Sequence, residues 1–154
     1  MSLVDLRNIA TIIGVTIALF TFLKGIIEYV KQGSQKRAEH FNYMRKKFKE
    51  NEIFNNICTL LDTNDKELIS IKYAYKRDFL GFFEEVALMM NSKIIKKDVV
   101  HYMFGYYAIR CWKSDSFWKG INRESIYWNL FKEFAITMSK VEVKYKFKNS
   151  NYRF

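Results

Sequence analysis

Residues that break helices or cross-link small folds are scarce in this sequence. Among its 154 residues there is no proline, and glycine occurs six times, which excludes collagen-like, proline-rich and glycine-rich chains. Because proline is the strongest breaker of helices, its absence favours long helices over a turn-rich β fold. The two cysteines and two histidines lie far apart, so they predict neither a disulfide framework nor a metal site.

Apolar and aromatic residues, in contrast, are abundant. Hydrophobic residues make up 49% of the chain and aromatic residues 18%, so the chain can bury a core and is not a disordered polymer. Its length suits one domain and leaves little room for two.

The net charge of +10 would ordinarily suggest a nucleic acid as partner, but the excess is confined to two places. Residues 24–49 hold eight basic and two acidic side chains, and residues 140–154 hold five basic and one acidic. Residues 1–23 and 50–139 are each neutral overall. Because residues 50–139 are neutral and contain no recognised nucleic-acid-binding motif, nucleic acid is an unfavoured partner.

A long apolar stretch lies near the N-terminus. The sequence NIATIIGVTIALFTFL (residues 8–23) carries no charge, and 25 residues from Leu3 to Ile27 are available if Asp5, Arg7 and Lys24 lie at the interfaces. A spanning helix needs about 20 residues. We therefore expect one transmembrane helix, preceded by a short outer tail, within residues 1–30.

Two other interpretations of this stretch compete with a membrane span. A signal peptide has a basic start and small residues at a cleavage site, but this chain has Asp5 early and no A-x-A-like site after the apolar run. A buried or partner-packed helix would show a polar face, but large apolar residues surround this helix on every side. The span is the favoured interpretation.

The basic residues predict the orientation of this span. Lysine and arginine flanking a span favour the cytoplasmic side, so we expect the N-terminus outside and everything after residue 24 in the cytoplasm. Residues 31–50 are expected to continue as a basic juxtamembrane helix. Its cations either contact anionic lipid or form a solvated face; they are Lys31, Lys36, Arg37, Arg45, Lys46, Lys47 and Lys49.

Residues 51–141 show helical periodicity. Apolar residues recur every three or four positions in 76–91, 97–112 and 125–141, and a shorter helix fits 51–62. We therefore expect an all-α fold, in which the transmembrane helix continues into a cytoplasmic antiparallel helical bundle. One aromatic cluster could be core or a partner-binding patch, with core favoured: Trp112, Phe117, Trp118, Tyr127 and Trp128.

The C-terminal tail has a different pattern. VEVKYKFK (residues 141–148) alternates apolar and charged residues, which is the spacing of a strand, but one isolated strand is not stable. We expect residues 142–154 to be a disordered basic tail, with an interfacial segment pressed into lipid as the alternative.

Few residues carry candidate chemistry. Glu84 and Glu85 are adjacent, so on a helix they point about 100° apart and cannot act as a catalytic pair. We expect one of them to form a structural ion pair with Arg110. Gly81 and Gly105 lie inside helical patterns and favour close approach of two helices. We expect no catalytic residue, no bound cofactor and no metal ligand.

Three stretches together resemble one known family. They are KQGSQKRAEHF (31–41) after the apolar run, KRDFLGFFEEVALMMNS (76–92), and VVHYMFGYYAIRCW (99–112) ahead of FW (117–118). The family consists of small bacterial membrane-anchored helical proteins that share a domain of unknown function. The resemblance covers nearly the whole chain and implies a place in the bacterial inner membrane, but it supplies no activity.

These observations leave several function classes in competition. The favoured one is a non-enzymatic membrane-anchored module whose cytoplasmic surface binds a protein partner or a second copy. The alternatives are a membrane-acting effector, for example in bacterial defence, whose anchors associate through small residues and perturb the bilayer, and a nucleic-acid-binding protein that uses the basic helix and tail. An enzyme with an unrecognised site is the least favoured.

Overall fold

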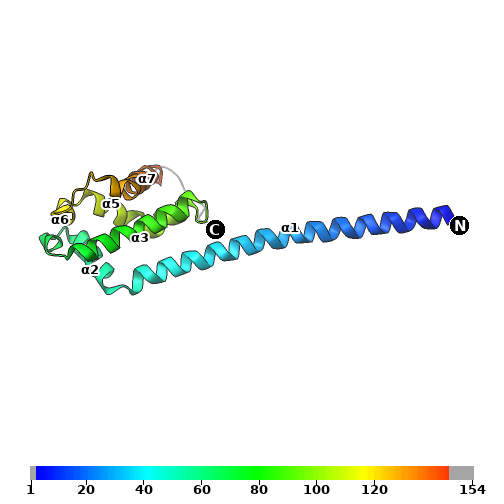
Figure 1. Ribbon diagram of the computed structural model, residues 1–154, viewed down its shortest axis with the longest axis horizontal. Coiled ribbons are helices and arrows are strands. Elements are labelled where there is room, and N and C mark those ends of the chain that lie inside the picture. Colours follow the sequence, from blue (N-terminus) through cyan, green and yellow to red (C-terminus); the bar gives the residue numbers. More distant parts are fainter. Residues whose placement is uncertain (1–2, 146–154) are drawn as a thin grey trace. The chain divides into compact units, whose positions relative to one another are not determined.

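The structure, a computed structural model, describes residues 3–145, and every regular element in this range is a helix (Figure 1). This confirms the predicted all-α class. The elements are α1 (Leu3–Glu50), α2 (Glu52–Thr63), η1 (Lys66–Ile69), α3 (Tyr73–Asn91), α4 (Lys97–Val100), η2 (His101–Gly105), α5 (Tyr106–Lys113), α6 (Asp115–Trp118), η3 (Ile126–Trp128) and α7 (Asn129–Tyr145).

The chain divides into two units, which we call the N-terminal unit (Met1–Ala38) and the C-terminal unit (Glu39–Phe154). The second unit starts earlier than the predicted bundle boundary at residue 51. The reason is that Phe41, Met44 and Phe48, on the last turns of α1, are buried in the core of the C-terminal unit. Residues 39–50 are therefore a structural part of that unit and not only a basic extension of the membrane segment.

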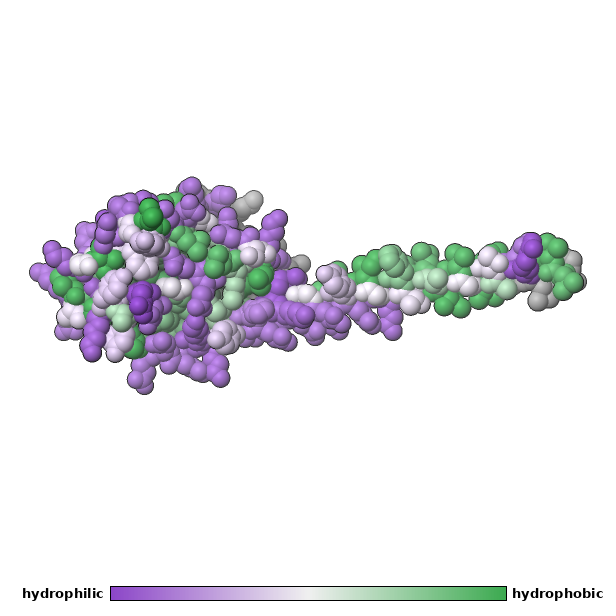
Figure 2. Space-filling view, viewed as in Figure 1, coloured by the Kyte–Doolittle hydropathy of each residue, from purple (hydrophilic) through white to green (hydrophobic). Residues whose placement is uncertain are grey.

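The N-terminal unit consists of α1 residues with exposed apolar side chains. Figure 2 shows these apolar residues gathered along the visible face of its helix. Large side chains between residues 12 and 30 are at least 45% exposed. They are Ile12, Ile13, Val15, Ile17, Leu19, Phe20, Phe22, Leu23, Ile26, Ile27, Tyr29 and Val30.

Helices α2 and α3 form close to where the periodicity predicts them. The side chain of Asn51 accepts a hydrogen bond from the Phe54 backbone N–H at 3.0 Å, which caps the start of α2. Asn64 ends α2 in the left-handed region, with φ 52°. Helix α3 begins at Tyr73, three residues before the predicted start at 76.

The predicted helix over 97–112 is continuous but not uniformly α-helical. Five residues, His101–Gly105, form a π-helix between α4 and α5. The predicted helix over 125–141 begins as the 3-10 helix η3, where the Ser125 side chain accepts from the Tyr127 backbone N–H at 3.4 Å, and then becomes α7. Ser125 therefore caps the start of η3.

Helix α7 extends to Tyr145, so the predicted disordered tail is wrong for residues 142–145. Val141, the last residue of the predicted helix, is buried, and the helix continues for four residues beyond it despite the alternating sequence. The rest of the predicted tail, residues 146–154, lies outside the described residues.

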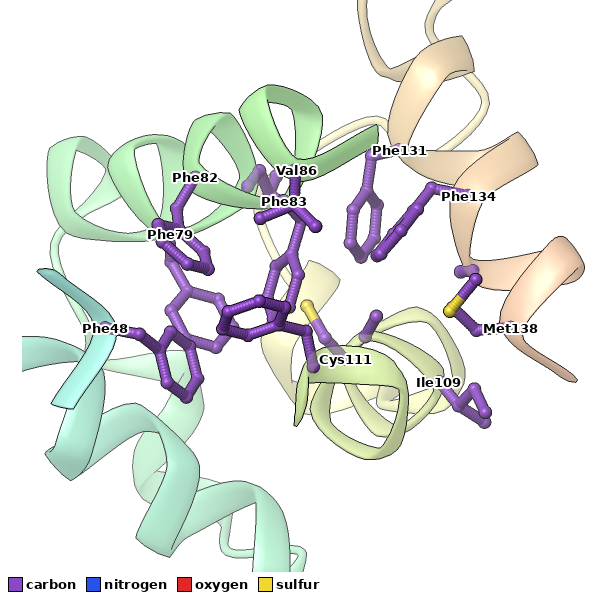
Figure 3. Packing of buried hydrophobic residues seen from close by; sticks show 14 of the residues in the cluster. Phe48, Phe79, Phe82, Phe83, Val86, Ile109, Cys111, Phe131, Phe134 and Met138 are labelled. Carbon is purple, nitrogen blue, oxygen red and sulfur yellow. The ribbon is translucent and has the colours of Figure 1, made fainter. Parts of the chain in front are cut away.

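The core of the C-terminal unit is mainly aromatic. Helix α3 packs on α7, and α5 packs on both α7 and α2. Figure 3 shows phenylalanine rings from α1, α3 and α7 converging beside Cys111 of α5. Tilted and edge-to-face ring pairs fill the centre, such as Phe79 against Phe83 with centroids 5.0 Å apart. Of the aromatic cluster between 112 and 128, Phe117 and Trp118 are core, whereas Tyr127 is 81% exposed.

Candidate functional site

The apolar part of α1 is the first candidate site. It is long and apolar enough to cross a membrane, and none of its most apolar window is buried in the structure. Its three threonines hold their hydroxyl groups inside the helix, because each donates to the carbonyl four residues earlier, at 2.7–2.9 Å: Thr11 to Arg7, Thr16 to Ile12 and Thr21 to Ile17. The polar atoms of these side chains therefore need no partner outside the helix.

The seven predicted lipid-contact cations divide by environment. Five are exposed, and Arg37 and Lys47 are half-buried. Lys47 donates to the Glu85 carboxylate at 2.7 Å, and Lys46 lies 4.0 Å from Glu50. Within residues 3–145, the exposed Lys31, Lys36, Arg45 and Lys49 form no ion pair. Lys47 thus pairs with a residue of the C-terminal unit, and lipid contact of all seven cations stays a prediction.

The predicted ion pair between Arg110 and Glu84 or Glu85 is wrong. Glu85 takes Lys47 of α1 as its partner. Glu84 is half-buried, and desolvation raises the pKa of its carboxyl, against a smaller lowering by a hydrogen bond from the Phe131 backbone. The sequence could not select among these pairings, because they depend on which helices become neighbours.

Arg110 instead closes the C-terminal end of α2. Its Nη1 donates to the backbone carbonyls of Leu61 at 2.9 Å and Asp62 at 3.3 Å, both in the last turn of α2. The Tyr106 and Tyr107 hydroxyls donate to the two carboxylate oxygens of Asp62, at 2.9 and 3.2 Å. The Arg110 guanidinium also lies 4.9 Å from the centre of the Tyr106 ring. This cluster fastens α5 to α2.

The two glycines do not mark close helix–helix contacts, contrary to the prediction. A Cβ on Gly81 would meet nothing within 4 Å. A Cβ on Gly105 would lie 2.7 Å from Cδ2 of His101, on the same π-helix. Gly105 therefore makes room for an imidazole one turn earlier in its own helix.

The cysteines lack the character of reactive or metal-binding groups. Both are free and buried. Burial raises the pKa of the Cys58 thiol to about 12 and also raises that of Cys111, so both are protonated at neutral pH. Over residues 3–145, no group of three or more His, Cys, Asp or Glu side chains is placed to hold a metal ion.

A cavity beside Cys58 is the second candidate site. We call it the Cys58 cavity; its volume is about 210 Å³. Its lining comes from the end of α1, from α2, and from the π-helix with α5: Arg45, Phe48, Lys49, Asn55, Cys58, Met103, Phe104 and Tyr107. Sequence reasoning missed it, because a gap between packed side chains leaves no periodic signal.

Lys76, the first residue of the predicted helix over 76–91, is buried despite its charge. The residue is only 2% exposed. Its Nζ lies 3.5 Å from the Lys119 carbonyl oxygen and 5.6 Å from the centre of the Phe117 ring. Burial lowers the pKa of this ammonium group. Its spacing, three residues before Phe79, was the available signal.

Comparison with known proteins assigns the sequence to one family. The sequence model of a domain of unknown function (DUF4760) matches residues 8–139. The chain belongs to this family. The DUF4760 match begins in the apolar part of α1 and ends in α7, so it includes residues of both units. No curated protein and no solved structure matches the chain.

Proposed function

We propose that this DUF4760 protein is a non-enzymatic, single-pass membrane-anchored module. The observation that carries the proposal is that no other part of the described chain, residues 3–145, buries the most apolar window of α1. Exposed apolar surface on this scale is costly in water, whereas a helix in lipid satisfies every backbone polar group internally. The 25 residues from Leu3 to Ile27 give a helix of about 37 Å, enough for a hydrocarbon core of about 30 Å with some tilt.

The charges support an orientation with the C-terminal unit in the cytoplasm. The basic residues follow the apolar segment, which is the arrangement of the positive-inside rule. Lys31 and Lys36 are exposed and carry no ion pair within the described part of the chain, so their ammonium groups are free to meet anionic headgroups of the inner leaflet of a bacterial membrane. The C-terminal unit then forms an antiparallel helical bundle that offers its surface to a protein partner or to a second copy.

A membrane extraction experiment tests the anchor. The full-length chain should stay in the membrane pellet after carbonate and dissolve only in detergent. The variant I13K/I17K should move to the carbonate-soluble fraction, because each charge at the centre of a span costs about 2.5–3.5 kcal/mol. The matched control is Ile69→Lys, which adds a charge at an exposed apolar residue of the C-terminal unit. A wild-type chain that is soluble without detergent would refute the anchor.

A second candidate, a membrane-acting effector, rests on a different observation. Gly14 and Ala18 are small, exposed and four residues apart, and a Cβ on Gly14 would meet nothing within 4 Å. This open face would let two anchors pack closely in the bilayer. Leakage of a dye from vesicles carrying the full-length chain, abolished by Gly14→Leu but not by Leu19→Ala, would support this candidate.

A further inference from the structure

The Cys58 cavity combines an apolar interior with a cationic rim. Phe48 and Phe104 are buried core rings, and Met103 lies beside them on the π-helix. The Cys58 thiol remains uncharged at neutral pH, since burial raises its pKa to about 12. The interior is therefore suited to hydrocarbon and unsuited to a charged group.

The size of the cavity limits what it can hold. A dry cavity of about 150 Å³ in a protein core can bind benzene. The Cys58 cavity, at about 210 Å³, is larger by a few methylene groups. A chain of about six to eight carbons fits this volume better than a long acyl chain or a polycyclic ligand.

Two cationic side chains lie at the opening of the Cys58 cavity, and neither has a carboxylate partner among the described residues. Arg45 and Lys49 line the cavity, are exposed, and form no ion pair within the described residues. The other polar lining groups are already occupied: the Asn55 amide donates to the Lys49 carbonyl at 2.9 Å, and the Tyr107 hydroxyl donates to Asp62 at 3.2 Å. Charge at this rim is therefore available to an anion from outside the chain.

We propose that the Cys58 cavity binds a small anionic amphiphile, with an apolar chain of about six to eight carbons inside and a carboxylate or phosphate at Arg45 and Lys49. The same chemistry is offered by a free medium-chain carboxylate and by the headgroup and upper chain of an anionic lipid. The site belongs to the C-terminal unit alone, so the proposal stands whether or not α1 spans a membrane.

The test follows the methyl group of Met103 in the full-length protein. The chain is labelled at its methionine methyl groups, placed in phosphatidylcholine nanodiscs, and titrated with octanoate under NMR observation. Met103 should show a saturable shift, while Met138, buried in α7 away from the cavity lining, should not. Octanol, with the same chain and no charge, should bind about tenfold more weakly. No saturable shift at Met103, or equal affinity for octanol, would overturn the proposal.

Matched variants separate this site from general electrostatic attraction. R45Q/K49Q should weaken octanoate binding about tenfold, whereas K31Q/K36Q removes the same charge from exposed positions outside the cavity and should change nothing. Cys58→Phe should fill the cavity and abolish binding. If Cys58→Phe does not fold, the two charge variants still test the proposal. An equal loss of octanoate affinity in R45Q/K49Q and K31Q/K36Q would contradict binding at the Cys58 cavity.

A second arm identifies the source of the ligand. Nanodiscs containing phosphatidylglycerol, without octanoate, present the same anionic chemistry as a lipid headgroup. A Met103 shift with phosphatidylglycerol assigns the site to membrane lipid. A shift with octanoate alone assigns it to a free carboxylate. If neither ligand shifts Met103, the proposal is refuted. Carbonate extraction tests the membrane anchor separately. If the anchor fails that test, the octanoate titration still shows whether the Cys58 cavity binds an anionic amphiphile.

Discussion

The two units of the chain use the same apolar side chains in opposite ways. In the N-terminal unit Phe20 is 68% exposed, whereas in the C-terminal unit Phe83 is fully buried and packs against rings of α3 and α7. The sequence already separates them, because residues 8–23 carry no charge whereas residues 76–91 carry five charged side chains beside an apolar face. What differs is whether the chain itself supplies the second surface that each apolar face needs.

This difference shows where each unit obtains its stability. The C-terminal unit buries its rings against one another and closes its own core. Among residues 3–145, no such surface covers the apolar part of the N-terminal unit, and the proposed anchor assigns that role to lipid. Equal substitutions in the two units should therefore have unequal effects, and the three tryptophans, all between residues 112 and 128, allow unfolding of the C-terminal unit to be followed alone by fluorescence.

The largest contrast is expected from removing a phenyl ring. Phe83→Ala should lower the free energy of unfolding of the C-terminal unit by about 3–5 kcal/mol, because it leaves a cavity in a packed core. Phe20→Ala should leave that free energy unchanged. Urea denaturation in detergent micelles, monitored by tryptophan fluorescence, measures both. Equal effects would mean that Phe20 also contributes to the core of the C-terminal unit, which its exposure contradicts.

A methyl group at glycine should give the next largest contrast. Gly105→Ala should destabilise the C-terminal unit by about 1–3 kcal/mol, since the new Cβ would lie 2.7 Å from the His101 ring and force a shift in the π-helix. Gly14→Ala meets nothing within 4 Å and should have no effect on that unit. Thermal denaturation of the two variants side by side is the measurement, and a neutral Gly105→Ala would show that the imidazole moves without cost.

The sequence was sufficient for features that depend on local periodicity. The spacing of Phe79, Phe82 and Phe83 predicted the buried face of α3, and the uncharged run in α1 predicted an exposed apolar helix. Features that depend on which helices become neighbours in the fold could not be predicted from the sequence. Arg110 had a plausible partner in Glu85, but the structure gives it Asp62, because α5 packs on the end of α2. The Cys58 cavity is a mismatch between packed surfaces and has no local sequence signature.

Lys76 offers a contrast between a buried and an exposed charge. Lys76→Met should raise the free energy of unfolding at pH 7 by about 1–2 kcal/mol. It removes an ammonium group that has a carbonyl and a ring as neighbours and, among residues 3–145, no carboxylate partner. Lys24→Met, at a side chain 78% exposed, should not change it.

The pH dependence of this effect has a definite sign. Burial lowers the pKa of Lys76 in the folded state below its ordinary value of 10.5, so the unfolded chain binds the additional proton between these two values. The stability of the wild-type protein should therefore rise with pH as 10.5 is approached, and this contribution should be absent in Lys76→Met. Denaturation curves at several pH values test the difference, and parallel profiles for the two proteins would contradict it.

The smallest contrast concerns the basic residues of α1, which the sequence presents as one group. Lys47→Ala should cost the C-terminal unit about 0.5 kcal/mol, because it breaks a half-exposed pair with Glu85 that lies 2.7 Å away. Lys31→Ala should cost nothing in stability, since its charge has no partner among residues 3–145. High salt should erase the effect of Lys47→Ala by screening the pair. Conversely, binding to vesicles with anionic lipid should weaken on loss of Lys31 more than on loss of Lys47, because only the former charge is free to reach a headgroup.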